Sequence, residues 1–328
     1  MTISRRSLLA MGGGAAAALA APGLIGRAVA QTRTLKISHQ FPGGTIEQGD
    51  FRDRLCRIFA KKVEEASKGA LKFEIYAGSS LMKTNAQFAA LRKGGLDINL
   101  GLMPSLVTSN EQGAKWKNAP IGKAIEKILE EKGVKMISWI WQAGGVASRD
   151  KDIRVPEDAK GIKVRGGSRE MDRLFAAAGS QVSTMPSNEI YIGMQTGALD
   201  AALTSSTSLI SFRLEELAKS LTSARKGSFW FMCEPLMMSK AIFDSLSPEQ
   251  QKVILDVGAE MEPWGTAEAQ KDDQKVAEVY SAKGCRVVDL SADDLAKWRA
   301  LAEETAWKDF ASKSTEAAEL LKLAKQVS

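Results

Sequence analysis

The chain has 328 residues, of which 44% are hydrophobic and 26% are charged, and its formal net charge is +6. The length exceeds what one hydrophobic core usually serves and favours two domains. Arg5, Arg6 and Arg27 lie in the first thirty residues, which hold no acidic residue, so the rest of the chain carries only +3. Its basic residues are mixed with acidic ones along helix-like stretches, which is typical of solvated helix faces. This balance excludes nucleic acid as an expected partner.

Residues 1–30 have the features of a secretory signal. Arg5-Arg6 precedes an Ala- and Gly-rich apolar run, Ala10 to Ile25, and Ala28-Val29-Ala30 offers the small residues that a signal peptidase reads. Paired arginines before a weakly apolar run favour the twin-arginine route over general secretion. A membrane anchor is the weaker reading, because a span needs roughly 20 strongly apolar residues. We therefore expect a mature periplasmic protein that begins near Gln31 and does not itself span the membrane.

The cysteines do not form a disulfide pattern. Cys56, Cys233 and Cys285 are far apart and odd in number, whereas a disulfide framework has an even and denser set. Three separate thiols acting as small core residues are the expectation, with one bridge as the open alternative.

From Thr34 onward, strand-like and helix-like patterns alternate. Residues 71–76 alternate with period two, as in a half-buried strand, and residues 51–66 carry apolar side chains at helical spacing. The rhythm of strand, helix and strand predicts a mostly parallel sheet covered by helices. The expected strands are 35–38, 71–76, 96–100 and 134–141, and the expected helices are 51–66, 85–92 and 121–132.

A break is expected at Gly144-Gly145, where a charged stretch with Pro156 follows and the chain crosses between domains. Beyond it, the expected strands are 161–164, 181–184, 198–203, 228–232 and 236–239, and the expected helices are 168–178 and 187–196. Pro248 after Ser247 is typical of a helix start. The apolar pattern then runs to Tyr280, interrupted only at 263–265, and this length predicts a helix that spans both domains.

The predicted fold class is therefore α/β with two lobes, each a mixed, mostly parallel sheet flanked by helices, with a long lobe-spanning C-terminal helix. Lobe I would comprise residues 31–148 plus about 240–290. Lobe II would comprise 149–239 plus about 291–328. The ligand cleft would lie between the lobes.

The chemistry that the sequence lacks favours a binding protein over an enzyme. The only histidine is His39, and the cysteines are scattered, so no cluster has zinc or iron spacing. The chain has no G-x-S-x-G elbow, no phosphate loop and no glycine fingerprint after a strand. We expect no catalytic residue, no metal and no cofactor, and we interpret His39 as a structural or pocket-edge residue.

Arg165 is the strongest candidate ligand residue. It ends the predicted strand 161–165 and leads through Gly166-Gly167-Ser168 into a helix. Ligands of open α/β sheets bind at the carboxyl ends of the strands. A bidentate guanidinium beside helix N-terminal N–H groups suits a carboxylate. From position alone, a surface arginine is the alternative.

Several motifs along the chain belong together. They are Phe59-Ala60-x-x-Val63, Gly94-Gly95-Leu96-Asp97, Gly161-Ile162-Lys163-Val164-Arg165, Met185-Pro186-Ser187-Asn188-Glu189-Ile190-Tyr191, Met194-Gln195-Thr196-Gly197-Ala198-Leu199-Asp200 and Leu246-Ser247-Pro248-Glu249-Gln250. With these motifs the chain resembles the DctP-type extracytoplasmic solute receptors of TRAP transporters. That resemblance implies a periplasmic binding protein fold whose two lobes close on a C4-dicarboxylate, a sugar acid or another organic acid. It also implies partnership with a small and a large membrane subunit, energised by an ion gradient.

The resemblance also implies the ligand site. Arg165 falls on the family's arginine that pairs with the ligand carboxylate, and the open form would expose it before closure excludes water. Many members have a second arginine where this chain has Gly144-Gly145, which weakens the case for a dicarboxylate and favours a monocarboxylate with an apolar or aromatic body. The alternatives are a receptor that reports to a sensor kinase and an exported periplasmic enzyme. The further candidate contacts are Ser168, Thr204, Ser205, Gln40 and Ser187, together with Phe229 and Trp141, which are cleft or core residues.

Overall fold

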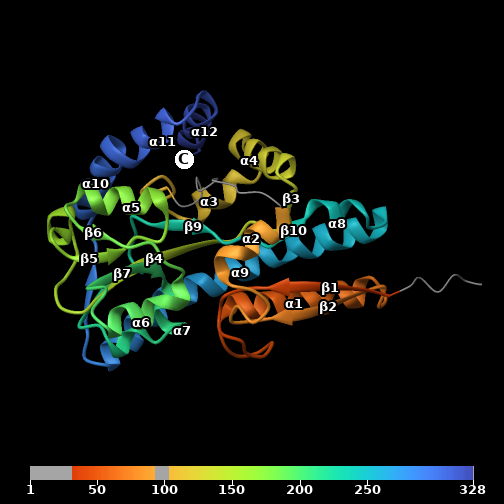
Figure 1. Ribbon diagram of the computed structural model, residues 1–328, viewed down its shortest axis with the longest axis horizontal. Helices are drawn as coiled ribbons and strands as arrows, with labels where there is room; N and C mark the ends of the chain where they lie inside the picture. Colours follow the sequence, from red (N-terminus) through yellow and green to blue (C-terminus); the bar gives the residue numbers. More distant parts are fainter. Residues whose placement is uncertain (1–31, 93–102, 328) are drawn as a thin grey trace, which may run out of the picture. The chain divides into compact units, whose positions relative to one another are not determined.

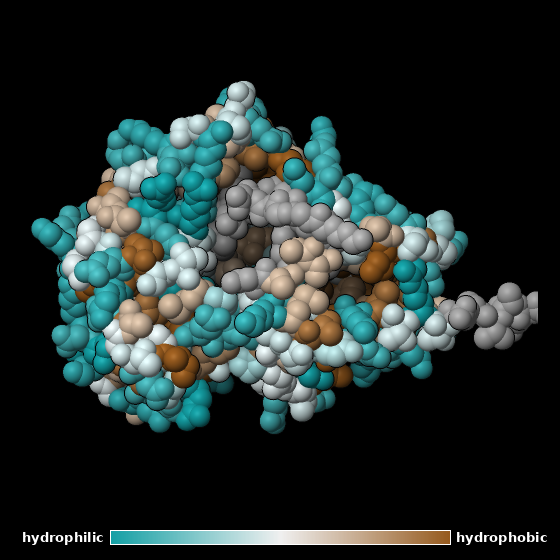
Figure 2. All heavy atoms as spheres, viewed as in Figure 1, coloured by the Kyte–Doolittle hydropathy of each residue, from teal (hydrophilic) through white to brown (hydrophobic). Residues whose placement is uncertain are grey.

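The computed structural model describes residues 32–92 and 103–327. The predicted signal at 1–30 and the predicted strand at 96–100, with its Gly94-Gly95 helix stop, lie outside these residues. Residues from Thr32 onward form one compact unit. None of the helices in the described part of the chain is long and apolar enough to cross a membrane. The face in Figure 2 is mainly hydrophilic, with scattered apolar residues.

The N-terminal elements form a small layer against a long helix. Strands β1 (Arg33–Ser38) and β2 (Leu71–Tyr76) pair in parallel across helix α1 (Phe51–Ala66). The buried face of α1 carries the apolar residues expected from its spacing, and it packs on α9 (Pro248–Ala282) (Figure 1). The first hydrophobic core consists of residues such as Phe51, Leu55, Phe59, Ile254 and Met261.

The next segment is helical and ends in a short strand. It comprises α2 (Thr84–Arg92), α3 (Asn110–Trp116), α4 (Pro120–Glu131) and β3 (Val134–Met136). β3 pairs antiparallel with β10 (Met237–Ser239), which leads into α8 (Lys240–Asp244). The single strand expected at 134–141 is thus two strands separated by 137–140.

The main sheet has the order β11-β8-β4-β7-β5-β6, with β9 also paired to β4. β4 (Trp141–Ser148) is antiparallel to β7, β8 and β9, whereas the pairs β11·β8, β7·β5 and β5·β6 are parallel. The sheet is mixed because β4 enters it against the direction of the others. Its remaining strands are β5 (Lys163–Arg165), β6 (Gln181–Val182), β7 (Ala201–Ser205), β8 (Ser220–Ser223), β9 (Phe231–Cys233) and β11 (Arg286–Asp289).

The break expected at Gly144-Gly145 is wrong, because both glycines lie inside β4. Close packing, rather than a turn, requires glycine at these two positions. A Cβ atom on Gly144 would overlap the Thr204 carbonyl and the Trp230 ring, and one on Gly145 would overlap the Thr222 carbonyl. Neighbouring backbone therefore approaches both positions too closely for any side chain.

Helices cover both faces of the main sheet (Figure 1). α6 (Ile190–Gln195) and α7 (Ser206–Ser211) pack on one face in a second core with Leu209, Leu221, Val276 and Tyr280. The other face forms a third core with α5 (Arg169–Ala177) and α10 (Ala292–Ala302). The remaining elements are α11 (Lys308–Ser312), α12 (Thr315–Lys325), the π-helical turn Glu303–Trp307 and the 3-10 turns Pro156–Ala159, Ser187–Glu189 and Leu214–Glu216.

Helix α9 confirms the expected long C-terminal helix. Ser247 and Gln250 form a reciprocal capping box around Pro248 at its first turn. Its 35 residues extend about 50 Å at 1.5 Å per residue, enough to contribute to both the first and the second core. The apolar pattern is interrupted at 263–265, but the helix is continuous there: Pro263 lies within it and Gly265 packs closely on Ile140.

The three cysteines are free, as expected. Cys56 and Cys285 are buried and Cys233 is partly buried. Burial raises the pKa of the Cys56 thiol to about 12 and also raises those of Cys233 and Cys285. These thiols are therefore weakly nucleophilic at neutral pH.

Candidate functional site

Arg165 ends β5 inside the molecule, with only 7% of its surface exposed, so the surface alternative is wrong. Its Nε–H donates to the Met185 carbonyl at 3.0 Å and its Nη1–H donates to the Leu203 carbonyl at 2.8 Å. Among the described residues, no carboxylate forms an ion pair with it within 4.0 Å. Burial lowers the pKa of Arg165 to about 10, so it stays charged at neutral pH. A buried cation without a paired carboxylate is costly to fold and suits an anionic ligand.

The sequence around Arg165 fixes its position. Val164 and Arg165 pair in parallel with Ala201 and Ala202 at the start of β7, so Arg165 lies at the carboxyl end of β5 and β7 continues beyond it. Gly167 has φ +92°, and a Cβ atom there would lie 2.6 Å from Arg165 Nη1. Glycine at 167 therefore serves both the turn and the guanidinium.

Ser168 lies directly beyond this turn and caps α5. Its Oγ accepts the Met171 N–H at 3.2 Å, and the residue is buried. The hydroxyl hydrogen of a capping serine remains able to donate, so Ser168 can cap the helix and still donate to a carboxylate.

Thr204 and Ser205 end β7 and are buried next to the strand that carries Arg165. Ser205 caps α7 through the Ser208 N–H at 3.2 Å. Thr204 lies directly beyond Leu203, whose carbonyl holds Arg165. Thr204 and Ser205, which the resemblance proposed as ligand contacts, therefore follow by one and two residues the carbonyl that Arg165 contacts.

Ser187 and Gln40 lie on different elements. Ser187 is buried two residues after Met185, whose carbonyl also holds Arg165. Gln40 follows β1 and is partly buried, with its Oε1 buried and unpaired. It precedes Phe41, whose ring lies against the Arg52 guanidinium of α1.

Phe229 and Trp141 are both packed against other aromatic rings. Phe229 stacks on Trp298 with ring centroids 4.4 Å apart, and Trp141 meets Trp116 edge to face at 5.3 Å. These contacts favour the core interpretation for Phe229. Trp141 is buried in the same core, and its indole Nε1, like that of Trp116, has no hydrogen-bond partner among the described residues.

Sequence reasoning missed Arg52, which lies in the first turn of α1. It is 3% exposed, and its Nη2 pairs with Asp50 Oδ2 at 2.6 Å. Its Nη1–H donates to Ser205 Oγ at 3.2 Å, so it reaches a predicted ligand residue from another element. The sequence contained a signal: Arg52 stands three residues before Leu55 and four before Cys56, on the apolar face of the helix.

His39 is held in a buried polar cluster. Its Nε2 lies 3.1 Å from Asp53 Oδ1, and Asp53 also accepts from the Gly44 N–H and from Arg57. Burial lowers the pKa of His39 although Asp53 opposes the shift. Within residues 32–92 and 103–327, no group of three or more His, Cys, Asp or Glu side chains is placed to hold a metal ion.

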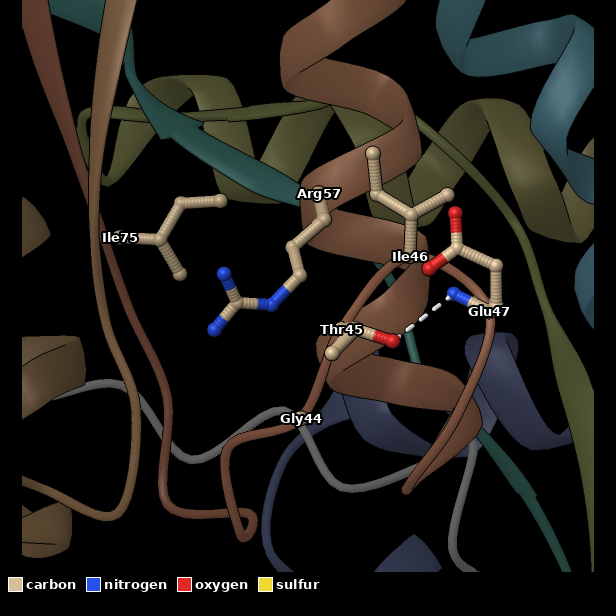
Figure 3. Close-up of a pocket in the computed structure, with 6 residues that line it drawn as sticks. All are labelled: Gly44, Thr45, Ile46, Glu47, Arg57 and Ile75. Atoms are coloured by element: carbon tan, nitrogen blue, oxygen red, sulfur yellow. Dashed lines mark hydrogen bonds between the residues drawn. The ribbon is translucent and has the colours of Figure 1, made fainter.

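A hollow of about 480 Å³ lies beside this cluster (Figure 3). It is lined by Gly44, Thr45, Ile46, Glu47, Arg57 and Ile75. None of the predicted ligand residues lines it, and its one cation, Arg57, already pairs with Asp53 at 2.7 Å. It is a surface feature of the N-terminal layer.

Comparison with known proteins gives consistent results. Residues 54–314 match the profile of the family described as bacterial extracellular solute-binding protein, family 7, or DctP. A solute-binding protein of Albidiferax ferrireducens is 58% identical and is aligned over 99% of both chains. The 2,3-diketo-L-gulonate-binding periplasmic protein YiaO of Escherichia coli is 25% identical, over 81% of this chain and 85% of its own. A TRAP periplasmic solute-binding protein from Rhodoferax ferrireducens, solved with bound malonate, superposes with a TM-score of 0.87 at 59% identity, over 89% of this chain and 98% of its own.

Proposed function

Because the chain belongs to the bacterial extracellular solute-binding protein family 7, we propose that it is the periplasmic receptor of a TRAP transporter and captures a small organic carboxylate on Arg165. The family consists of extracytoplasmic solute-binding proteins rather than enzymes. The observation that carries the proposal is the buried guanidinium of Arg165, which is held by two carbonyls and has no carboxylate of the described protein paired to it.

The two carbonyl contacts orient Arg165 for this role. They use Nε and Nη1, and the ligand carboxylate would approach the Nη2 side of the guanidinium. Ser168, which caps the helix after β5, and Thr204, which follows the Leu203 carbonyl, would donate to the remaining carboxylate lone pairs. Such donors are what makes a buried Arg–carboxylate pair tolerable. Ser205 already donates its hydroxyl hydrogen to Ser208 Oγ at 3.1 Å.

The ligand we propose is a short organic acid. The Rhodoferax ferrireducens relative was solved with malonate, which makes malonate the first acid to test. Gly144 and Gly145 occupy the position where a second ligand arginine was expected, and both are packed too tightly to accept a side chain. A monocarboxylate that uses Arg165 alone is therefore the second class to test.

We place the ligand between two lobes whose boundaries differ from those drawn from the sequence. The expected lobe I covered 31–148 plus about 240–290, and lobe II covered 149–239 plus about 291–328. β4 and β11 are hydrogen-bonded into the main sheet, so we assign both to lobe II. The chain then passes between the lobes at residues 137–140 and 234–236, and α9 forms a third connection between them.

The partners and the export route follow from the family and from the N-terminal sequence. Closure of the lobes would create the surface that the small and large membrane subunits bind. Arg5-Arg6 and the apolar run after it support export by the twin-arginine route.

The test is a thermal-shift screen of the mature protein, from residue 31 onward, against malonate and a panel of mono- and dicarboxylates. A ligand at a hundred times its dissociation constant stabilises the protein by roughly 2.7 kcal/mol. Arg165→Ala should abolish that shift. Arg173→Ala is the matched control, because Arg173 is exposed and pairs only loosely with Asp309 at 3.6 Å. Unchanged affinity in Arg165→Ala, or no response of the wild type to any acid, would refute the proposal.

A further inference from the structure

Contacts within lobe I orient the Arg52 side chain independently of lobe II. Its Nε–H donates to Asp50 Oδ1 at 2.9 Å and its Nη2–H to Asp50 Oδ2 at 2.6 Å. The guanidinium lies over the Phe41 ring, 3.5 Å from the centroid. Two parallel charge-assisted bonds and a stacked ring leave this side chain little freedom. Nη1 is consequently held at the edge of lobe I.

Hydrogen bonds from Arg52 Nη1 connect α1, which packs in the first core, to α7, which packs in the second. It donates to Ser205 Oγ at 3.2 Å and to Ser208 Oγ at 3.1 Å. These serines belong to the first turn of α7, whose Leu209 is part of the second core, whereas Phe51, beside Arg52, is part of the first. The two bonds therefore join elements that pack in different lobes.

The charges around Arg52 decide what it can do. Glu234 Oε2 lies 3.9 Å from Nη1, and the negative charges of Asp50 and Asp272 also act on Arg52 and raise its pKa. With this many carboxyl groups around a single cation, a further carboxylate would be repelled. Arg52 is thus unsuited to be the second ligand anchor that the sequence lacks at Gly144-Gly145.

Arg52 and Arg165 nevertheless contact the same short segment of chain. Arg165 donates to the Leu203 carbonyl, and Arg52 donates to the hydroxyl of Ser205, two residues further on. Between them is Thr204, a predicted ligand contact. A ligand that fixes this strand end in lobe II also fixes the two serines that Arg52 must reach from lobe I.

We propose that Arg52 is a positioning residue that couples ligand capture to lobe closure, by bonding Ser205 and Ser208 when the lobes meet. This inference rests on the proposed function of Arg165. Loss of the Arg52 bonds opens the lobes more often and releases ligand faster, while the encounter of ligand with Arg165 in the open form is unaffected.

The test measures association and dissociation rates of malonate for the mature protein. Ser208→Ala removes one hydrogen bond from Arg52 and leaves the Asp50–Arg52 pair intact. Arg52→Lys keeps the positive charge but loses the guanidinium, whose separate nitrogens bond Asp50 and the serines of α7 at the same time. We expect each to raise the dissociation rate roughly tenfold with an unchanged association rate, since bonds to charged groups are strong. The double variant should have a dissociation rate close to that of Arg52→Lys, because both changes break the same contact between Arg52 and α7.

The control is Arg54→Ala on the same helix. Arg54 donates to Glu268 of α9 at 2.6 Å and contacts neither serine of α7, so its loss lowers the melting temperature without changing the dissociation rate. A dissociation rate in Ser208→Ala and Arg52→Lys equal to that of the wild type would overturn the proposal. So would a rise of the same size in Arg54→Ala.

A second measurement separates failure of this inference from failure of the proposed function. Spin labels at Ile192→Cys in lobe II and Ile242→Cys in lobe I report the distance between lobes, and these side chains are 59% and 39% exposed. The native thiols, with raised pKa values, label poorly. If no acid binds the wild type, the proposed function fails, yet Ser208→Ala should still shift the ligand-free population towards longer distances. Identical distance distributions in all variants would overturn the inference.

Discussion

Gly167→Ala tests directly whether the position of the Arg165 guanidinium governs binding. The new methyl group would lie 2.6 Å from Nη1 and 3.1 Å from Cζ of Arg165, so the guanidinium must move from its carbonyl contacts. Alanine at φ +92° also carries backbone strain of about 1–2 kcal/mol. The substitution therefore combines a general loss of stability with a local displacement of the ligand residue.

Gly161→Ala separates these two effects. Gly161 has φ +79° and precedes the same strand, but a Cβ atom there meets nothing within 4 Å. Both variants should lose about 1–2 kcal/mol of stability, a fall of a few degrees in melting temperature. Only Gly167→Ala should also weaken malonate binding, by at least tenfold, because charge-assisted bonds from Arg165 are lost.

Isothermal titration with malonate and thermal unfolding without ligand provide both readouts. If Gly167→Ala binds malonate as tightly as Gly161→Ala does, then the guanidinium position is not what limits affinity. If both variants lose affinity equally, the effect comes from backbone strain next to β5 and not from contact with Arg165.

Two further substitutions test the packing around the site. Asp273 accepts a hydrogen bond from Ser206, and burial raises its pKa to about 7. Between about pH 4 and 7 the folded state therefore keeps a proton on Asp273 that the unfolded state has lost. The free energy of unfolding consequently falls as the pH rises through that window. Asp273→Asn should remove this dependence and raise the melting temperature at pH 8 but not at pH 4; a difference independent of pH would contradict the assignment. Gly145→Ala should destabilise by at least about 3 kcal/mol or prevent soluble expression, because the methyl group overlaps the Thr222 carbonyl across the sheet; a melting temperature within a few degrees of the wild type, measured by circular dichroism, would contradict it.

Elements with a local physical cause were predictable from the sequence. The capping box of Ser247 and Gln250 and the proline at the first turn start α9 where the pattern indicated. The period-two alternation at Leu71–Tyr76 gave the strand with its bounds. In both cases the decisive contacts join residues within a few positions of each other, so the order of residues alone specifies them.

The position of Arg165 at the end of a strand was predictable for a related reason. Its place at the end of a strand, before two glycines and a helix cap, depends on a short stretch of chain, and the family resemblance named it independently. Its burial and its contacts with the Met185 and Leu203 carbonyls required the neighbouring strand and loop.

The wrong break at Gly144-Gly145 and the main omission concern contacts between distant residues. Gly144 and Gly145 indicated a break because glycine is common in turns, yet carbonyls of Thr204 and Thr222 press on them from neighbouring strands. Pro263 removes one hydrogen bond from the helix, yet α9 continues through it and packs in both cores, as its expected length required.

Arg52 shows the same limit at the site itself. Its partners Ser205 and Ser208 follow it by 153 and 156 residues, and no local pattern connects them. The sequence by itself determined the elements with local signals, the position of Arg165 at a strand end, and the family. Only the tertiary structure decided which glycines are packed, which cations are buried and which residues join the lobes, because those properties arise where distant segments come into contact.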